Sequence, residues 1–201
     1  MQVFSMVAVG VTNLFIGARY FVLIRRQRIK PALAMWVFFT IAVCGSLATY
    51  LSEGDYSLMD NALNTMDILL VSFVVVVILI YGDRSTKFSR FDVGCFVAVV
   101  AILVAWVFTR QHAAAHIAIQ AILVIAYIPV VKRMGTSQQN TESFGAWIGL
   151  LLAPIFSLLA SRGSLATLYA VRTIVCSSAL LVLMIRLEWK VRSLAARGQG
   201  K

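Results

Sequence analysis

The sequence predicts an all-α, polytopic membrane protein: seven transmembrane helices arranged as two parallel three-helix repeats joined by a linker helix. Seven apolar runs each contain close to the roughly 20 residues that cross a hydrocarbon core as helix. The runs lack the polar face that a water-soluble helix needs, and basic residues gather on alternate connections between them. The composition agrees, because 61% of the residues are hydrophobic and only 13% are charged, with a mean hydropathy of +0.89.

The seven runs follow one another through short connections. They cover Val3–Ile24, Leu33–Leu51, Ala62–Tyr81, Phe91–Thr109, Ala113–Val131, Phe144–Ala160 and Leu165–Leu187. Backbone groups cannot stay unpaired in lipid, so each run should be a helix, and the period-two alternation of a membrane barrel is absent. Seven spans in 201 residues leave no room for a separate soluble domain. We expect the first run to be a span rather than a cleaved signal peptide, since no basic residue precedes it.

The basic residues predict the orientation. They are Arg25, Arg26, Arg28 and Lys30 after the first run, Arg84, Lys87 and Arg90 after the third, Lys132 and Arg133 after the fifth, and Arg186, Lys190, Arg192, Arg197 and Lys201 after the seventh. Basic connections stay in the cytoplasm, so we expect an integral protein of the cell membrane with its N-terminus outside and its C-terminus cytoplasmic. The net charge of +10 then faces anionic lipid. A nucleic-acid partner is not expected, because no basic stripe is interleaved with aromatic residues.

Two of these connections resemble each other. Residues 25–36 read RRQRIKPALAMW and residues 132–147 read KRMGTSQQNTESFGAW, and both lead to a tryptophan inside the next helix. The chain therefore divides into a three-helix bundle over 1–82, a linker helix over 83–110 and a second three-helix bundle with a basic tail over 111–201. One linker helix inserts both triplets in the same direction, which gives a parallel repeat about an axis near the membrane normal. Seven helices without duplication are the alternative.

At these connections the chain resembles the PQ-loop/SWEET-like superfamily of small-solute transporters. Pro129 ends a helix before a basic loop, and Trp147 lies just inside the next helix. The family usually has glutamine after that proline, where this chain has Val130. Trp36 matches in the first half, but the proline that should end the first helix is missing. The resemblance implies three plus one plus three helices, transport of a sugar or similar solute, and hinges at Pro129 and Pro154. Vitamin-precursor transporters are a second relative to consider.

Polar residues inside the apolar runs are costly, so they are candidates for function. They recur at helical spacing on the first, third, fifth and seventh runs, where Tyr169 and Cys176 flank one arginine. The predicted substrate-binding set is Asn13, Asn64, Asp67, Gln120 and Arg172. We expect this set to converge in the outer half of the bilayer as a pocket open to the outside. Alternatively, Asp67 and Arg172 form one structural ion pair, and the amides hydrogen-bond across helices.

Three further features have two interpretations each. His112 and His116 lie four residues apart, as in a metal or haem pair, but we expect them to be hydrated near the surface. No motif such as HExxH or CxxCH supports a metal or cofactor, and none is expected. Gly145 and Gly149 form a GxxxG packing face, either within the bundle or between subunits. Pro154 should kink its helix, either as a hinge or as a routine feature of a membrane helix.

The predicted function is therefore transport of a small polar solute, such as a sugar or vitamin precursor, by alternating access. The alternative is a non-catalytic membrane scaffold or assembly subunit that uses the GxxxG face, and a homo-oligomer is left open. An enzyme is not expected, because the sequence has no GxSxG or HExxH motif and Asp67 is its only acidic residue deep in a span. A retinal protein is excluded, because every lysine lies at a helix end or in a connection.

Overall fold

The computed structural model describes residues 1–29, 31, 33–82, 90–128, 130, 131, 134 and 143–198, with only the backbone at residues 34 and 191–198. These residues form helices and no strands, which confirms the all-α class. The elements are α1 (Gln2–Arg25), α2 (Leu33–Glu53), the 3-10 helix η1 (Leu58–Asn61), α3 (Ala62–Tyr81), α4 (Arg90–Thr109), α5 (His112–Ile125), α7 (Phe144–Leu158) and α8 (Gly163–Gly198). Pro129 and the first predicted domain boundary, at residues 82 and 83, involve positions outside the described residues.

Five of these helices are long and apolar enough to cross a membrane, judged by length and composition. They are Gln2–Arg25, Met35–Glu53, Leu58–Tyr81, Arg90–Thr109 and Gly163–Lys190. Two more apolar helices are shorter, since α5 has 14 residues and α7 has 15. The sequence explains the short α5, because the carbonyl of Ile125 would bond to the backbone N–H of residue 129, and proline has none. The long apolar helices indicate an integral membrane protein.

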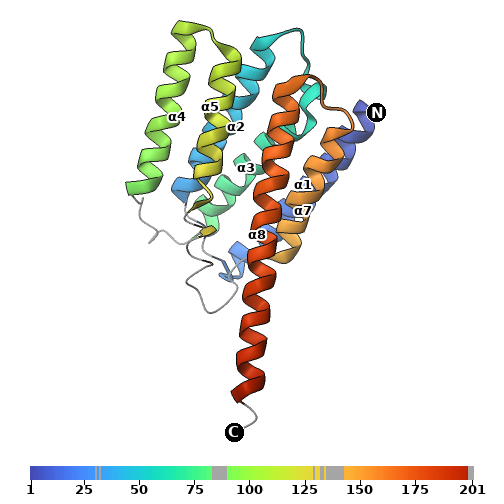
Figure 1. Cartoon of the computed structure of the whole chain (residues 1–201), viewed down its shortest axis with the longest axis vertical. Coiled ribbons are helices and arrows are strands. Elements are labelled where there is room, and N and C mark those ends of the chain that lie inside the picture. The colour runs from blue at the N-terminus through green and yellow to red at the C-terminus, as the bar shows by residue number, and fades with distance from the viewer. Residues whose placement is uncertain are drawn as a thin grey trace.

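The helices pack in the same order in both halves of the chain (Figure 1). Helix α3 packs against both α1 and α2, and α8 packs against both α7 and α5. Between the halves, α1 packs against α7 and α2 packs against α5. Helix α4 lies at the edge of the bundle against α5 and α2. In each half, the third helix therefore contacts the other two.

The two tryptophans that follow the similar connections are both buried against a tyrosine. The ring centroids of Trp36 and Tyr20 are 5.1 Å apart, with an edge-on arrangement. The centroids of Trp147 and Tyr127 are 6.1 Å apart. Each tryptophan thus lies against the first helix of its own half, or against the residues that directly follow that helix.

Pro154 lies inside α7 and removes one helical hydrogen bond, the one that would reach the carbonyl of Leu150. The hydroxyl of Ser177 on α8 lies 3.3 Å from that carbonyl and also contacts the carbonyl of Thr173 in its own helix, so its single proton is shared between the two. A neighbouring helix therefore partly satisfies the group that the proline frees, as membrane helices commonly require. Whether Pro154 acts as a hinge stays a prediction.

The predicted GxxxG face packs inside the chain, against α1. A Cβ built at Gly149 would lie 2.7 Å from Cγ1 of Ile16, and one at Gly145 would lie 3.8 Å from Nε of Arg19. Helix α1 therefore occupies this face, and the scaffold alternative loses the surface on which it rested.

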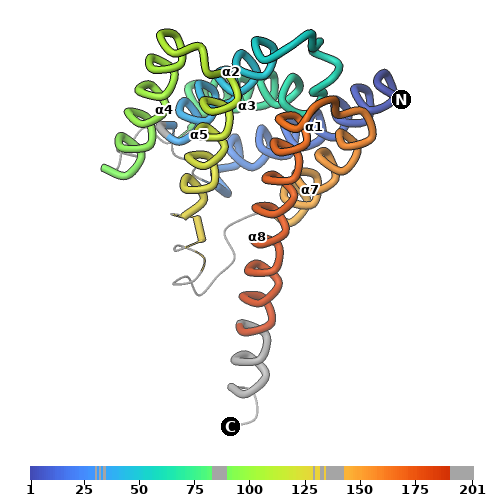
Figure 2. Tube along the Cα trace, turned by 45° about the horizontal axis from the view of Figure 1, so that its top comes forward, coloured from blue at the N-terminus to red at the C-terminus, as the bar shows by residue number. Residues whose placement is uncertain are grey.

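Helix α8 is longer than the run that predicted it. It has 36 residues, or about 54 Å at 1.5 Å per residue, which exceeds a hydrocarbon core of about 30 Å. Figures 1 and 2 show it continuing past the ends of the other helices towards the C-terminus. The exposed Trp189 lies in this extension.

Candidate functional site

A cluster of polar side chains lies inside the apolar bundle, where five helices meet. We call it the polar cluster. It consists of Asn13 on α1, Ser46 and Thr49 on α2, Asp67 on α3, His116 and Gln120 on α5, and Tyr169 and Arg172 on α8. Helices α1, α3, α5 and α8 all begin at the same end of the bundle (Figure 1). Residues a few turns into each of these helices therefore lie at comparable depth.

The acidic half of the cluster is built around Asp67. The amide Nδ2 of Asn13 donates to Oδ1 of Asp67 over 2.9 Å, and the hydroxyl of Tyr169 donates to Oδ2 over 2.9 Å. Tyr169 and Asn13 are buried, and Asp67 is half-buried. The Oδ1 atom of Asn13 is buried without a hydrogen-bond partner. Each carboxylate oxygen thus accepts one neutral donor and keeps capacity for a second.

The basic half is built around Arg172. Its Nε donates to Oε1 of Gln120 over 2.9 Å, and Nε2 of Gln120 donates to Oγ of Ser46 over 2.8 Å. Tyr127 also interacts with the Arg172 side chain. The amide of Gln120 therefore links the guanidinium of α8 to α2. The basic half therefore joins three helices, α2 from the first half of the chain and α5 and α8 from the second.

His116 extends the basic half and is fully buried. Its Nδ1 lies 3.0 Å from the carbonyl oxygen of Ser46 and 3.2 Å from Oγ1 of Thr49. A carbonyl oxygen only accepts, so the contact with Ser46 favours a proton on Nδ1, and the ring also contacts the backbone of Leu165 and lies 3.4 Å, through Nε2, from Nε2 of Gln120. The expectation of a hydrated histidine near the surface was wrong for His116, because α2 covers it with a serine and a threonine.

Tyr169 connects the two halves. Its hydroxyl binds Asp67, while Cζ of Arg172 lies 4.8 Å from the centroid of its ring, which is a cation–π contact. Asp67 and Arg172, both described, form no direct ion pair. The structural alternative of one direct Asp67–Arg172 pair is therefore wrong in its simple form, because Asp67 contacts the hydroxyl end of Tyr169 and Arg172 contacts the face of its ring.

Four of the five predicted binding residues belong to this cluster, and Asn64 does not. Its Nδ2 donates to the carbonyl of Val43 over 2.9 Å, and its backbone N–H donates to Oδ1 of Asn61 over 3.3 Å. Asn64 thus joins α3 to α2. It lies three residues before Asp67, which turns it about 60° round the helix, enough to face a different neighbour.

Sequence reasoning missed Ser46 and Thr49 altogether. A serine or threonine in a membrane helix usually bonds to a carbonyl one turn back, as Thr49 does with Gly45 over 3.0 Å. Such residues are inexpensive in an apolar run and give no signal in the sequence. Tyr169 did give a signal, because it lies three residues before Arg172 on the same stripe.

Hydrogen bonds and an ion pair join two connections at one end of the bundle. We call Tyr50, Asp60, Arg162 and Gly163 the clasp. The Asp60 carbonyl accepts from the Arg162 backbone N–H over 3.0 Å, and the Arg162 carbonyl accepts from the Tyr50 hydroxyl over 2.9 Å. Nη1 of Arg162 lies 3.6 Å from Oδ1 of Asp60. These contacts join the α2–α3 connection to the α7–α8 connection, and a pocket open to the outside stays a prediction.

Two details keep the clasp compact. Gln2 donates through Nε2 to Oδ1 of Asp60 over 2.6 Å, which attaches the start of α1. Gly163 has φ of +79°, a backbone conformation that favours glycine. A Cβ at Gly163 would also lie only 2.6 Å from the hydroxyl oxygen of Tyr56, and the Tyr56 ring stacks on Tyr50 with centroids 4.7 Å apart.

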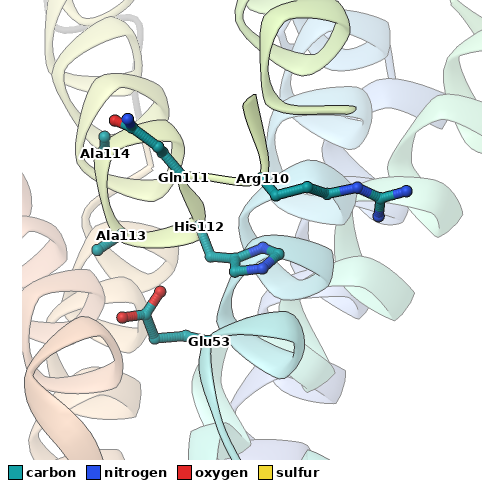
Figure 3. A pocket seen from close by; sticks show the side chains of 6 residues that line it. All are labelled: Glu53, Arg110, Gln111, His112, Ala113 and Ala114. Atoms are coloured by element: carbon teal, nitrogen blue, oxygen red, sulfur yellow. The ribbon is translucent and has the colours of Figure 1, made fainter. Parts of the chain in front are cut away.

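A shallow hollow of about 470 Å³ lies at the same end, outside the polar cluster. It is lined by Glu53, Arg110, Gln111, His112, Ala113 and Ala114, and Figure 3 shows the Glu53 and His112 side chains next to each other. The indole of Trp106 donates to Nδ1 of His112 over 2.8 Å. In the part of the chain that the structure describes, no group of three or more His, Cys, Asp or Glu side chains could hold a metal ion.

Comparison of the chain with family models, curated proteins and solved structures finds no match.

Proposed function

We propose that this chain is a transporter that moves a small polar solute across a membrane by alternating access, with the polar cluster as its binding site. The main observation behind the proposal is how Asp67 and Arg172 are placed around Tyr169. Two side chains of opposite formal charge lie within apolar helices and are half-buried; Asp67 bonds to the hydroxyl of Tyr169 and Arg172 lies over the ring of Tyr169. A lone charge in a membrane costs about 3 kcal/mol or more, so a purely structural pair would be expected to collapse into direct contact.

The position of the cluster supports binding rather than packing alone. Its members come from both halves of the chain, as when Tyr169 of α8 bonds to Asp67 of α3 and Gln120 of α5 bonds to Ser46 of α2. Transporters built from repeats bind their solute at the interface between those repeats, near the middle of the bilayer. A solute here would touch both halves at once.

The packing order supports two parallel three-helix repeats. In both halves the third helix contacts the first and the second, and the contacts between halves exchange first with second helices. That exchange is what a two-fold axis near the membrane normal would produce. The proposal therefore includes seven membrane spans, among them the short α5 and α7, and a relationship to the PQ-loop/SWEET-like superfamily. It also includes a location in the cell membrane with the N-terminus outside.

The clasp supports alternating access. It holds the two halves together at one end through Asp60 and Arg162. We infer that a solute reaches the polar cluster from this end only after the clasp has opened. Rocking of one three-helix unit against the other would open the route to the polar cluster at one end of the bundle and close it at the other.

Flux into liposomes tests the proposal. The purified protein is reconstituted, and entry of labelled glucose, sucrose, nicotinamide and alanine is compared with entry into protein-free liposomes. We expect saturable entry of at least one solute, and loss of it when Asp67→Asn and Arg172→Gln are combined. The proposal fails if every solute enters at the protein-free rate, or if the well-folded double variant transports normally.

A further inference from the structure

The hydrogen-bonding capacity that remains in the polar cluster is divided between two places. Around Asp67, most of the remaining capacity belongs to acceptors, although the Asn13 amide also keeps a second N–H. The carboxylate receives one bond on each oxygen, from Asn13 and Tyr169, and an ionised carboxylate can accept about four. Oδ1 of Asn13 belongs to the amide that already contacts Asp67, is 95% or more buried with its residue at 5% exposure, and has no partner. The group that fits here is a donor with several hydrogens and a positive charge.

Around Arg172, mainly donors remain. Its Nε–H is used by Gln120 and the Tyr127 hydroxyl also interacts with the guanidinium, which carries five N–H donors and no acceptor, so further N–H donors remain. The pair of terminal nitrogens forms a planar fork that matches a carboxylate. The ring of Tyr169 supports one face of this fork at 4.8 Å. The group that fits at Arg172 is therefore an anion with two oxygens.

The two places are one tyrosine side chain apart. Tyr169 touches Asp67 with its hydroxyl and Arg172 with its ring. A neutral sugar can bond to both places but compensates neither charge. A cation or an anion compensates one charge and leaves the other alone in the membrane, where an isolated charge is costly. A small molecule that carries both charges compensates both and adds no net charge.

We infer that the solute of this site is a small zwitterion, such as a free α-amino acid, with its ammonium group at Asp67 and Asn13 and its carboxylate at Arg172. The inference rests on the proposed function and names the substrate class of the same site. The ammonium group and the carboxylate are each recognised by one half of the cluster. Each contact can therefore be removed separately, by changing the ligand or by changing the protein.

Binding to the purified full chain tests the inference. The twenty common free amino acids are screened by thermal stabilisation, and each one that binds is compared with its N-acetyl and methyl ester forms, and with glucose and sucrose. We expect at least one free amino acid to bind. Blocking the amine or the carboxylate removes a charge-assisted contact and should weaken binding by about 10-fold to 100-fold, given tenfold for each 1.4 kcal/mol.

Variants assign each end of the ligand. Asp67→Asn should reduce the affinity for the free amino acid to that of its N-acetyl form and leave the N-acetyl form unchanged. Arg172→Gln should do the same for the methyl ester. Asp55→Asn and Arg19→Gln make the same chemical changes at exposed positions and should leave both preferences intact. Size-exclusion profiles check folding, and the blocked ligands on the unaltered protein decide the matter if a variant does not fold.

Three results would overturn the inference. One is binding or transport of glucose or sucrose with no binding of any amino acid, which leaves the proposed function standing. Another is equal affinity for the free and both blocked forms. The third is no binding of any solute together with no flux into liposomes, which overturns the proposed function as well.

Discussion

Gly149 leaves no room for a side chain between α7 and α1, and the neighbouring Gly145 does. A Cβ at Gly149 would lie 2.7 Å from Cγ1 and 3.1 Å from Cδ1 of Ile16, which is fully buried. A Cβ at Gly145 would meet nothing nearer than 3.8 Å. Gly149→Ala therefore forces two packed helices apart, which typically costs about 1–3 kcal/mol. Part of that cost is offset, because alanine favours helix over glycine by about 1 kcal/mol.

The net loss for Gly149→Ala is thus about 0–2 kcal/mol, from overpacking less helix propensity. A change of 1 kcal/mol moves the Tm of a chain of this size by about 2–4 °C, so the Tm should fall by up to roughly 8 °C. Gly145→Ala, the matched control four residues away, should keep or raise the Tm. Thermal unfolding in detergent, followed by tryptophan fluorescence, measures both.

A second substitution locates the clash. Ile16→Ala alone should be strongly destabilising, by about 2–5 kcal/mol for a buried isoleucine. In the Gly149→Ala background, the new methyl group partly fills the space left by Ile16, so the double variant should lose less than the sum of the two single losses. Additive losses, or a Gly145→Ala variant that is less stable than Gly149→Ala, would show that the packing of α7 on α1 has been misread.

The remaining predictions concern α7, the clasp and the orientation. Ser177→Ala removes the shared donor from the carbonyl of the half-buried Leu150 in α7 and should cost about 0.5–1.5 kcal/mol, the net value of a typical hydrogen bond. Adding Pro154→Ala should recover stability because the helical bond returns, and thermal unfolding that is unchanged by Ser177→Ala contradicts this. Arg162→Gln should open the clasp. In a background with the other two cysteines replaced, a water-soluble thiol reagent should then label Cys176 several-fold faster than in the protein with Arg162, and an equal labelling rate argues against a gating role for the clasp. Asp55→Cys should react with an impermeant reagent on intact cells, whereas a cysteine in the α1–α2 connection should react only after permeabilisation, and the reverse pattern would invert the topology.

The sequence predicted the helices well where hydrophobicity alone decides them. The predicted run Val3–Ile24 became α1, Gln2–Arg25, and Ala62–Tyr81 matches α3. It did not predict the end of α8, because hydrophobicity reports where lipid begins and ends and does not report helix ends. The tail after Leu187 contains no proline and no glycine before Gly198, so nothing breaks the helix there.

The candidate site was predictable to the extent that polar residues are rare in apolar runs. Asn13, Asp67, Gln120 and Arg172 stood out for that reason, and the structure brings them together. Their partners were not predictable, because pairing depends on how the helices turn towards one another. Helical spacing fixes which residues share a helix face, but it does not say which neighbour that face meets. That is why Asn64, three residues from Asp67, bonds to α2 instead.

The strengths of the contacts between the two halves suit a site that must open and close. Arg162 in the clasp is 63% exposed while Asp60 is 2% exposed, and an ion pair with one hydrated partner contributes about 1 kcal/mol or less. The apolar contacts of α1 with α7 are continuous by comparison, and Gly149 brings these helices close. Rocking about the α1–α7 contact would therefore open the clasp at small cost while the packed helices stay together.

The bond from Tyr169 to Asp67 also crosses between the halves. A ligand ammonium at Asp67 would add a contact to the carboxylate that already joins the two halves through Tyr169, and a ligand shifts a conformational equilibrium only through such differences in contact. Ligand binding at Asp67 would then change the strength of the contact between the two halves, which has to change when the site opens or closes.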